Sequence, residues 1–215
     1  MKGIKFGDYH SYDDFHLILA SKEIGAPSVK THKIEIEGAD GDLDLTDFFG
    51  EPKYENVTHK FTFSTMEQLT QFLNQFSEIK NALHGKKMRI ILDDDPTFFY
   101  VGRLHVSSFT YEKGIGTVNI EADCEPYKYK LAKTVVSKTV SGTSTITLTN
   151  SRKRAVPEIS IQATGSLNIV YQQFNVWDLG SGSYTLPELE LVHGDNSVTV
   201  TGTGTITFTW QEGSL

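Results

Sequence analysis

The sequence predicts a mainly β protein, with a β-rich α+β N-terminal domain that contains one amphipathic helix, followed by a C-terminal β-sandwich. Three observations support this fold class. Apolar and polar residues alternate in most segments, which is typical of half-buried antiparallel strands. Only one segment, at about residues 65–84, has helical spacing. Residues 135–215 are rich in Ser, Thr and Gly and contain several short alternating runs, the pattern of a small sandwich.

The helix has recognisable start and stop signals. Ser64 is a suitable N-cap, and Glu67 three residues later completes a capping box. Gly85 is placed to end the helix with a positive φ. The apolar stripe between these signals is expected to pack in the core and consists of Leu69, Phe72, Leu73, Phe76, Ile79 and Leu83.

Strands are expected in the rest of the first domain, residues 1–134. Ile34 and Ile36 alternate with charged residues, and the turn signals from Gly38 to Asp42 follow them, so a hairpin is predicted at about residues 31–47. Similar alternation occurs at residues 61–63 and 118–122.

The second domain is expected at residues 135–215, with the boundary between Tyr129 and Lys138. Its predicted strands are marked by apolar residues that share one parity within each run. Gly202 and Gly204 lie inside such a run and indicate a bulge. The apolar residues of these runs are Ile146 and Leu148, Ile159 and Ile161, Leu189 and Leu191, and Val198, Val200, Ile206, Phe208 and Trp210.

Composition excludes several function classes. The net charge is −7, and the single basic cluster at residues 152–154 is too short for a phosphate-binding groove, so sequence-specific nucleic-acid binding is not expected. No apolar run approaches the roughly 20 residues that cross a bilayer, so membrane insertion is not expected, and neither is a secretory signal. The one cysteine, Cys124, is expected to be a small buried hydrophobic residue.

Catalytic, cofactor and metal sites are not expected, and neither is enzymatic activity. The seven histidines form no metal-binding spacing, and no nucleophile elbow or phosphate-binding loop occurs. Asp40, Asp42 and Asp44 begin a partial calcium-loop pattern, but Leu45 occupies the sixth position, where the sharp turn requires glycine.

Three stretches carry a resemblance to a known family. They are residues 27–46 with a G-x-D-G-x-L-D turn, residues 83–104 with a G-K…D-D-P…Y-x-G-R hairpin, and residues 122–129 with a closing P-Y-x-Y. In this order and spacing they resemble the N-terminal domain of the distal tail proteins of long-tailed, non-contractile bacteriophages, especially phages of Gram-positive hosts. The C-terminal half is similar in general character to the galectin-like domain of that family.

The resemblance implies a structural role without catalytic residues. Such proteins form a hexameric ring at the distal end of the tail, within the virion, after synthesis in the host cytoplasm. The ring joins the tail tube protein above to the tail-associated hub or lysin protein below, and it often anchors receptor-binding proteins. An acidic surplus suits a channel through which DNA passes without binding.

The predicted hairpin is a candidate inter-subunit contact, because it has many charged residues and few large apolar ones past Ile36. An ordinary surface hairpin is the alternative interpretation. The candidate contact residues are Lys33, Glu35, Glu37, Asp40, Asp42 and Asp44.

A carbohydrate-binding module that recognises host cell-wall polysaccharide through the C-terminal sandwich is the alternative function. Trp177 precedes a flexible Gly-Ser-Gly segment, so it could be exposed on a loop, whereas Trp210 shares the parity of Ile206 and Phe208 and is expected in the core. The candidate sugar platform is Trp177 with Gln173, Asn175 and Asp178.

Overall fold

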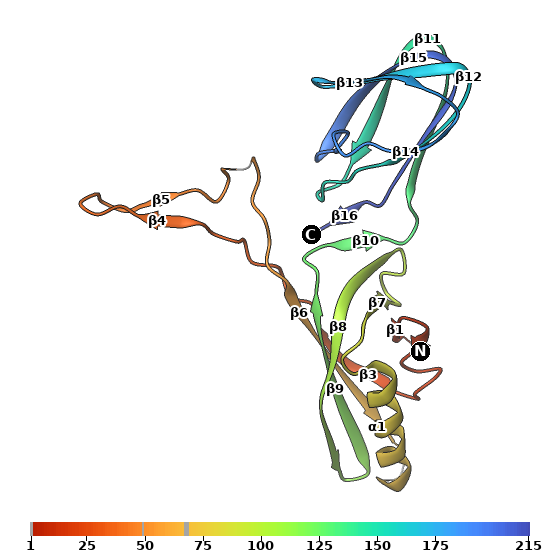
Figure 1. Ribbon diagram of the computed structural model, residues 1–215. Helices are drawn as coiled ribbons and strands as arrows, with labels where there is room; N and C mark the ends of the chain where they lie inside the picture. Colours follow the sequence, from red (N-terminus) through yellow and green to blue (C-terminus); the bar gives the residue numbers. More distant parts are fainter. Residues whose placement is uncertain (1, 49, 67–68) are drawn as a thin grey trace. The chain divides into compact units, whose positions relative to one another are not determined.

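The computed structural model describes residues 2–48, 50–66 and 69–215 (Figure 1). The chain divides into two compact units. Unit 1 comprises the residues up to Lys128 together with Leu215, and unit 2 comprises Tyr129–Ser214. The two units have separate hydrophobic cores, so each is described by itself.

Unit 1 is built on a large antiparallel sheet with the strand order β2-β1-β7-β8-β9-β6-β3. Alternation in the sequence places one face of each central strand in the core. Phe61 and Phe63 of β6 and Val118 and Ile120 of β9 are all buried, as predicted. The strands are β1 (Ile4–Phe6), β2 (Tyr9–His10), β3 (Ile18–Glu23), β6 (Val57–Thr65), β7 (Lys87–Leu92), β8 (Phe98–Glu112) and β9 (Ile115–Cys124).

One helix, α1 (Leu69–Leu83), packs on this sheet, and Gly85 follows it with a φ of 77°. The predicted cap at Ser64 is wrong, because Ser64 lies within β6 and is paired with Ile18 and Thr117. Glu67, the other half of the predicted capping box, lies outside the described residues.

The prediction that the whole apolar stripe of the helix is core is also wrong in part. Phe72, Ile79 and Leu83 are fully buried. Leu69 and Leu73, however, are 46% and 44% exposed, because they lie on one flank of the helix rather than beneath it.

Unit 2 is a single five-stranded sheet in which β15 and β12 lie at the centre. Its longest strands bend where glycines with positive φ meet in register. Gly142 on β11 stands opposite Gly202 on β15, and the pairing of β12 with β15 shifts between Ala163 and Leu167. The predicted irregularity at Gly202 is therefore present, with the extra residues on β12. The strands are β11 (Thr134–Asn150), β12 (Glu158–Tyr171), β13 (Phe174–Leu179), β14 (Gly182–Thr185) and β15 (Gly194–Trp210). The short strands β10 (Lys128–Lys130) and β16 (Gly213–Ser214) pair with each other and do not belong to this sheet.

The bend makes a sandwich from one sheet, since apolar residues from both sides of the bend share one core. Trp210 is buried and its Nε1 donates to Asn150 Oδ1 at 3.1 Å, as expected of a core residue. The strand predicted around Leu189 and Leu191 is wrong. Both side chains are buried, but the segment is a turn followed by an isolated bridge between Leu191 and Ala155.

Cys124 is fully buried at the end of β9, as predicted. Burial, followed by the nearby charges of Asp123 and Glu125, raises the pKa of its thiol to about 12. The protonated thiol therefore has little nucleophilic character.

Candidate assembly surface

A separate two-stranded hairpin extends the chain between β3 and β6 (Figure 1). Its strands β4 (Lys33–Glu35) and β5 (Asp42–Asp44) pair with each other and, among the described residues, with no other strand. The ladder continues toward the sheet through the Leu45 N to His32 O bond at 2.8 Å and the Lys30 N to Lys53 O bond at 2.8 Å. We call residues 28–48 and 50–55 the arm.

The tip of the arm turns at Gly38 and Gly41, whose φ values are 83° and 75°. Residues that carry a side chain rarely adopt such positive φ angles, so glycine is suited to both positions. The two glycines fix the register and set Ile34 directly opposite Leu43.

This register gives the arm two different faces. Ile34 and Leu43 share one face, and alternation adds Ile36 to it. We call these three side chains the apolar arm face. Ile34 is 43% exposed, Leu43 is 47% exposed and Ile36 is 48% exposed. An isolated two-stranded hairpin is only marginally stable in water, and this one leaves its apolar side uncovered.

The charged residues proposed from the sequence lie on the opposite face and at the tip. In the strand register, Lys33 stands opposite Asp44 and Glu35 stands opposite Asp42. Glu37 and Asp40 lie in the turn. A hydrogen bond from Thr46 lowers the pKa of the exposed Asp44 carboxyl. The hairpin predicted from the sequence is therefore present, whereas the candidate contact residues proposed from the sequence belong to its polar face and tip and do not include the apolar side chains.

The signal for the apolar face was present in the sequence. Counting outward from the glycine turn, Ile34 and Ile36 on one strand share the parity of Leu43 and Leu45 on the other. Each strand has only two of these apolar residues, and charged residues alternate with them. The charged residues therefore dominate the sequence of the hairpin, and its apolar face is difficult to recognise from the sequence alone.

The arm also carries most of the net charge of the chain. It has eight carboxylates against three lysines, which leaves five of the seven net negative charges on this one segment. Repulsion between such arms opposes nonspecific pairing at their edges.

The root of the arm is anchored to the sheet by His59 of β6. Gly25 N donates to His59 Nδ1 at 3.2 Å, so Nε2 carries the ring proton in the neutral form. The ring is buried beside Tyr100, with their centroids 4.6 Å apart, and burial lowers the pKa of His59. A Cβ on Gly25 would lie 2.7 Å from Val57 Cγ2, so the close approach requires glycine.

In unit 2 the candidate sugar platform lies on the edge strand β13. Trp177 is 63% exposed and belongs to this strand rather than to a loop. Asp178 has a φ of 58°, and its backbone N donates to Asn168 Oδ1 at 2.9 Å. Asn175 is exposed on the same strand, whereas Gln173 lies in the turn that precedes it.

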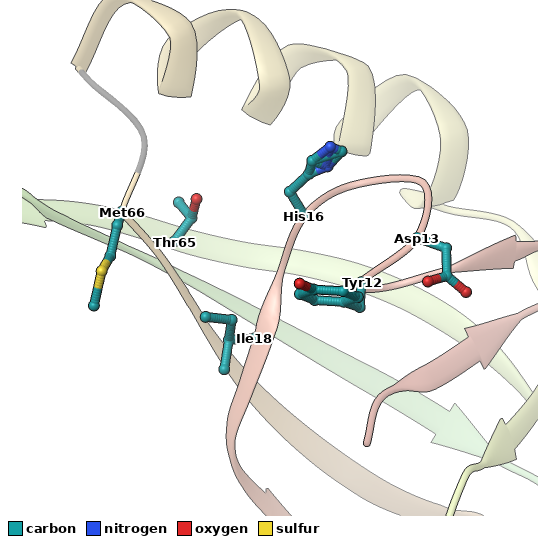
Figure 2. Close-up of a pocket in the computed structure, with 6 residues that line it drawn as sticks. All are labelled: Tyr12, Asp13, His16, Ile18, Thr65 and Met66. Atoms are coloured by element: carbon teal, nitrogen blue, oxygen red, sulfur yellow. The ribbon is translucent and has the colours of Figure 1, made fainter. Parts of the chain in front are cut away.

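A cavity of about 520 Å³ opens in unit 1 between the loop after β2 and the end of β6 (Figure 2). Tyr12, Asp13 and His16 line it from the loop, Thr65 from the end of β6, and Met66 from the position after that strand. His16 adopts a φ of 52° and also borders a second hollow along the helix. Figure 2 shows its ring between the loop and the helix.

Two further features are absent from the described residues. No group of three or more His, Cys, Asp or Glu side chains there is arranged to hold a metal ion. No helix in the same residues has the length and apolar character to span a membrane.

Comparison with known proteins gives a match at the level of structure. No protein-family model and no curated protein matches the chain. The whole chain is similar to the SPP1 Dit (gp 19.1) protein, with a TM-score of 0.75, 16% sequence identity and 100% of both chains covered. That protein is described as a paradigm of the hub adsorption apparatus in phages that infect Gram-positive bacteria. The mainly β, distal-tail-type fold expected from the sequence is therefore confirmed over the full length of the chain.

Proposed function

We propose that this protein is a structural subunit of a phage tail, located at the distal end of the tail in the virion. The observation that carries the proposal is the full-length structural similarity to a phage hub protein. The arm supports it, because a hairpin with an uncovered apolar face, which pairs with no other strand among the described residues, suits contact with another subunit.

Within this role, copies of the chain assemble into a hexameric ring, and the arm is the inter-subunit contact. The ring joins the tail tube protein to the tail-associated hub or lysin protein and offers a periphery for receptor-binding proteins. A head-to-tail interface suits such a ring, because each copy then contributes two different patches. The negative charge of the arm is compatible with DNA passing nearby without binding.

The test is the mass of the assembled protein at high concentration by light scattering, with negative-stain imaging of the same sample. Rings with a central hole are the expected result, either from the protein alone or after addition of tail tube and hub proteins. Monomers under all of these conditions would contradict the assembly role.

Carbohydrate binding is a second candidate function, favoured by the exposure of Trp177. Its neighbour Val176 pairs with the buried Ile169, so alternation places Trp177 on the outer face of the sheet. Asn168, Thr201 and Thr143 are aligned across three strands of this sheet and offer polar groups. An exposed aromatic ring beside hydroxyl and amide groups provides both stacking and hydrogen bonds to a sugar.

If unit 2 binds host cell-wall polysaccharide, replacement of Trp177 with alanine will reduce binding at least tenfold, since one stacking contact contributes about 1.5 kcal/mol. The measurement is a pull-down with purified polysaccharide followed by quantitation of the bound protein. Tyr12→Ala, which removes a 40% exposed aromatic residue from unit 1, is the matched control and leaves binding unchanged. Absence of binding by the wild-type protein would remove this function.

A further inference from the structure

The two flanks of helix α1 differ in both chemistry and surroundings. Its inner row packs on the sheet, with Phe72, Ile79 and Leu83 fully buried. Because successive residues are 100° apart, Gln75 and Glu78 lie on one side of this row and Leu69 and Leu73 on the other.

The polar flank faces the protein's own chain. Gln75 Nε2 donates to the backbone oxygen of Phe15 in the loop that precedes β3. His16 of the same loop borders the hollow along Gln71, Asn74 and Gln75 (Figure 2 shows His16 near the helix). The loop therefore contacts the polar flank at Gln75, whereas Gln71, Asn74 and Glu78 are exposed.

The apolar flank is left open. Leu69 and Leu73 are 46% and 44% exposed, and Phe109 of β8 beside them is 37% exposed. The ring of Phe76 packs against Phe109 with 4.4 Å between centroids, so these side chains form a continuous surface. Lys80 lies at one end of this surface, with its Nζ 5.5 Å from the centroid of the Phe76 ring. We call Leu69, Leu73, Phe76 and Phe109 the helix flank.

We propose that the helix flank of one copy receives the apolar arm face of a second copy. The inference rests on the proposed assembly function and names the surface that the arm contacts. Both surfaces consist of aliphatic or aromatic side chains, all of them exposed except the partly buried Phe76, and their contact would cover both.

Two further observations favour a second copy as the occupant. The arm does not cover the flank of its own copy, because both surfaces are exposed in the same chain. Ten residues separate Ser28 from the tip at Gly38, a reach of about 33 Å in extended conformation, which is about the width of a small domain. The arm is therefore long enough to reach a neighbour.

Charge is also complementary. The helix flank ends at Lys80, whereas the carboxylates of Glu37 and Asp40 lie in the turn at the tip of the arm, beside the apolar arm face. A lysine at the border of an apolar contact can pair with these carboxylates at the rim and fix the orientation of the arm.

The contact is heterologous, since the arm and the helix flank are different patches of the same chain. Each copy gives one arm and accepts another, so the arrangement propagates and closes if the rotation between neighbours permits. This is the geometry that a ring requires.

Site-directed disulfide formation tests the proposal directly. Cys124 is fully buried, so the wild-type chain provides a background without a reactive surface thiol. Leu43→Cys protein is mixed with Leu73→Cys protein, oxidised, and separated on a non-reducing gel, and the linked peptides are identified by mass spectrometry. The expected product is a heterodimer with its disulfide between the two substituted positions. A chain that carries both substitutions is expected to form a ladder of oligomers.

Matched controls use the adjacent residue on the opposite face. Asp42→Cys replaces Leu43→Cys, and Asn74→Cys replaces Leu73→Cys, and each control pair is expected to give at least tenfold less of the heterodimer. As a second measurement, Leu69→Ser with Leu73→Ser is expected to weaken self-association without shifting the thermal transition of the monomer.

The outcomes separate this inference from the proposed function. If copies assemble but Leu43→Cys links to another surface and not to Leu73→Cys, the helix flank is wrong as the acceptor and the assembly role stands. If the copies never assemble, even with tube and hub proteins present, both proposals are overturned.

Discussion

Replacing Ile34 and Leu43 with serine will prevent assembly of the protein while leaving each monomer folded. The two side chains face each other across the arm and are each about half exposed in the isolated chain. Covering the remaining surface contributes about 1 kcal/mol for each residue, so every interface loses about 2 kcal/mol. That loss weakens each contact by about 30-fold, and in a ring the losses at successive interfaces combine.

The measurement is light scattering over a concentration series, with the thermal transition recorded on the same samples. Because neither side chain belongs to the core of unit 1, the monomer's transition is expected to stay within about 2 °C of the wild type. The control is Glu35→Ser with Asp42→Ser, a pair of substitutions in the same register on the opposite face of the arm. If the control prevents assembly and the apolar variant does not, the charged face is the contact.

Replacing Glu212 with alanine will destabilise unit 2 by about 2 kcal/mol. Its carboxylate is buried and accepts hydrogen bonds from Lys130 Nζ at 2.5 Å and from the hydroxyls of Thr134 and Ser151. It thereby ties together the start of β11, the loop after β11 and the end of β15. The loss is smaller than the roughly 3–5 kcal/mol typical of a fully buried pair, because the Lys130 side chain is 43% exposed and can return to water.

Both tryptophans, Trp177 and Trp210, lie in unit 2, so intrinsic fluorescence follows the unfolding of this unit within the full chain. The midpoint is expected to fall by roughly 10 °C for a unit of this size. Glu188→Ala, which removes an exposed carboxylate of the same unit, is the control and leaves the midpoint within about 2 °C.

The pH dependence of this effect has a defined sign. Burial raises the pKa of Glu212, but the hydrogen bonds from Lys130, Ser151 and Thr134 together outweigh it, so the pKa of the folded protein lies below the ordinary value. The stabilisation is therefore present above the ordinary carboxyl pKa and is lost as the pH falls through the lower, folded value. The difference between wild type and Glu212→Gln should shrink over that range, and a difference that grew toward acid pH would contradict this account.

Alternation along the chain was enough to predict the strands around Phe61, Ile120 and Ile146, because one face of each strand is buried and the other is not. It failed at Leu189 and Leu191, since two buried leucines two residues apart also fit a turn that inserts both into a core. Periodicity reports burial, and the backbone pairing that defines a strand must be supplied by a neighbour far away in sequence.

The candidate site was harder to predict for a related reason. Helical spacing placed Leu69 and Leu73 in the same stripe as Phe72, but only the loop and sheet around the helix decide which flank is covered. In the arm, the sequence indicated the hairpin and its charge, whereas the pairing of Ile34 with Leu43 depends on where the glycine turn sets the register. The apolar arm face and the helix flank could be identified only from the folded chain, in which these apolar side chains are left exposed.

The outer face of β11 and β15 has a different chemistry from the arm. Threonine and serine hydroxyls meet across the two strands, as in Thr139–Thr205 and Thr143–Thr201, each with 3.1 Å between oxygens. Hydroxyls that bond to one another carry no charge to screen and no proton that titrates near neutral pH. The interactions that these hydroxyls offer to a neighbouring molecule are therefore expected to be the same in dilute and concentrated salt, and at mildly acidic or mildly basic pH.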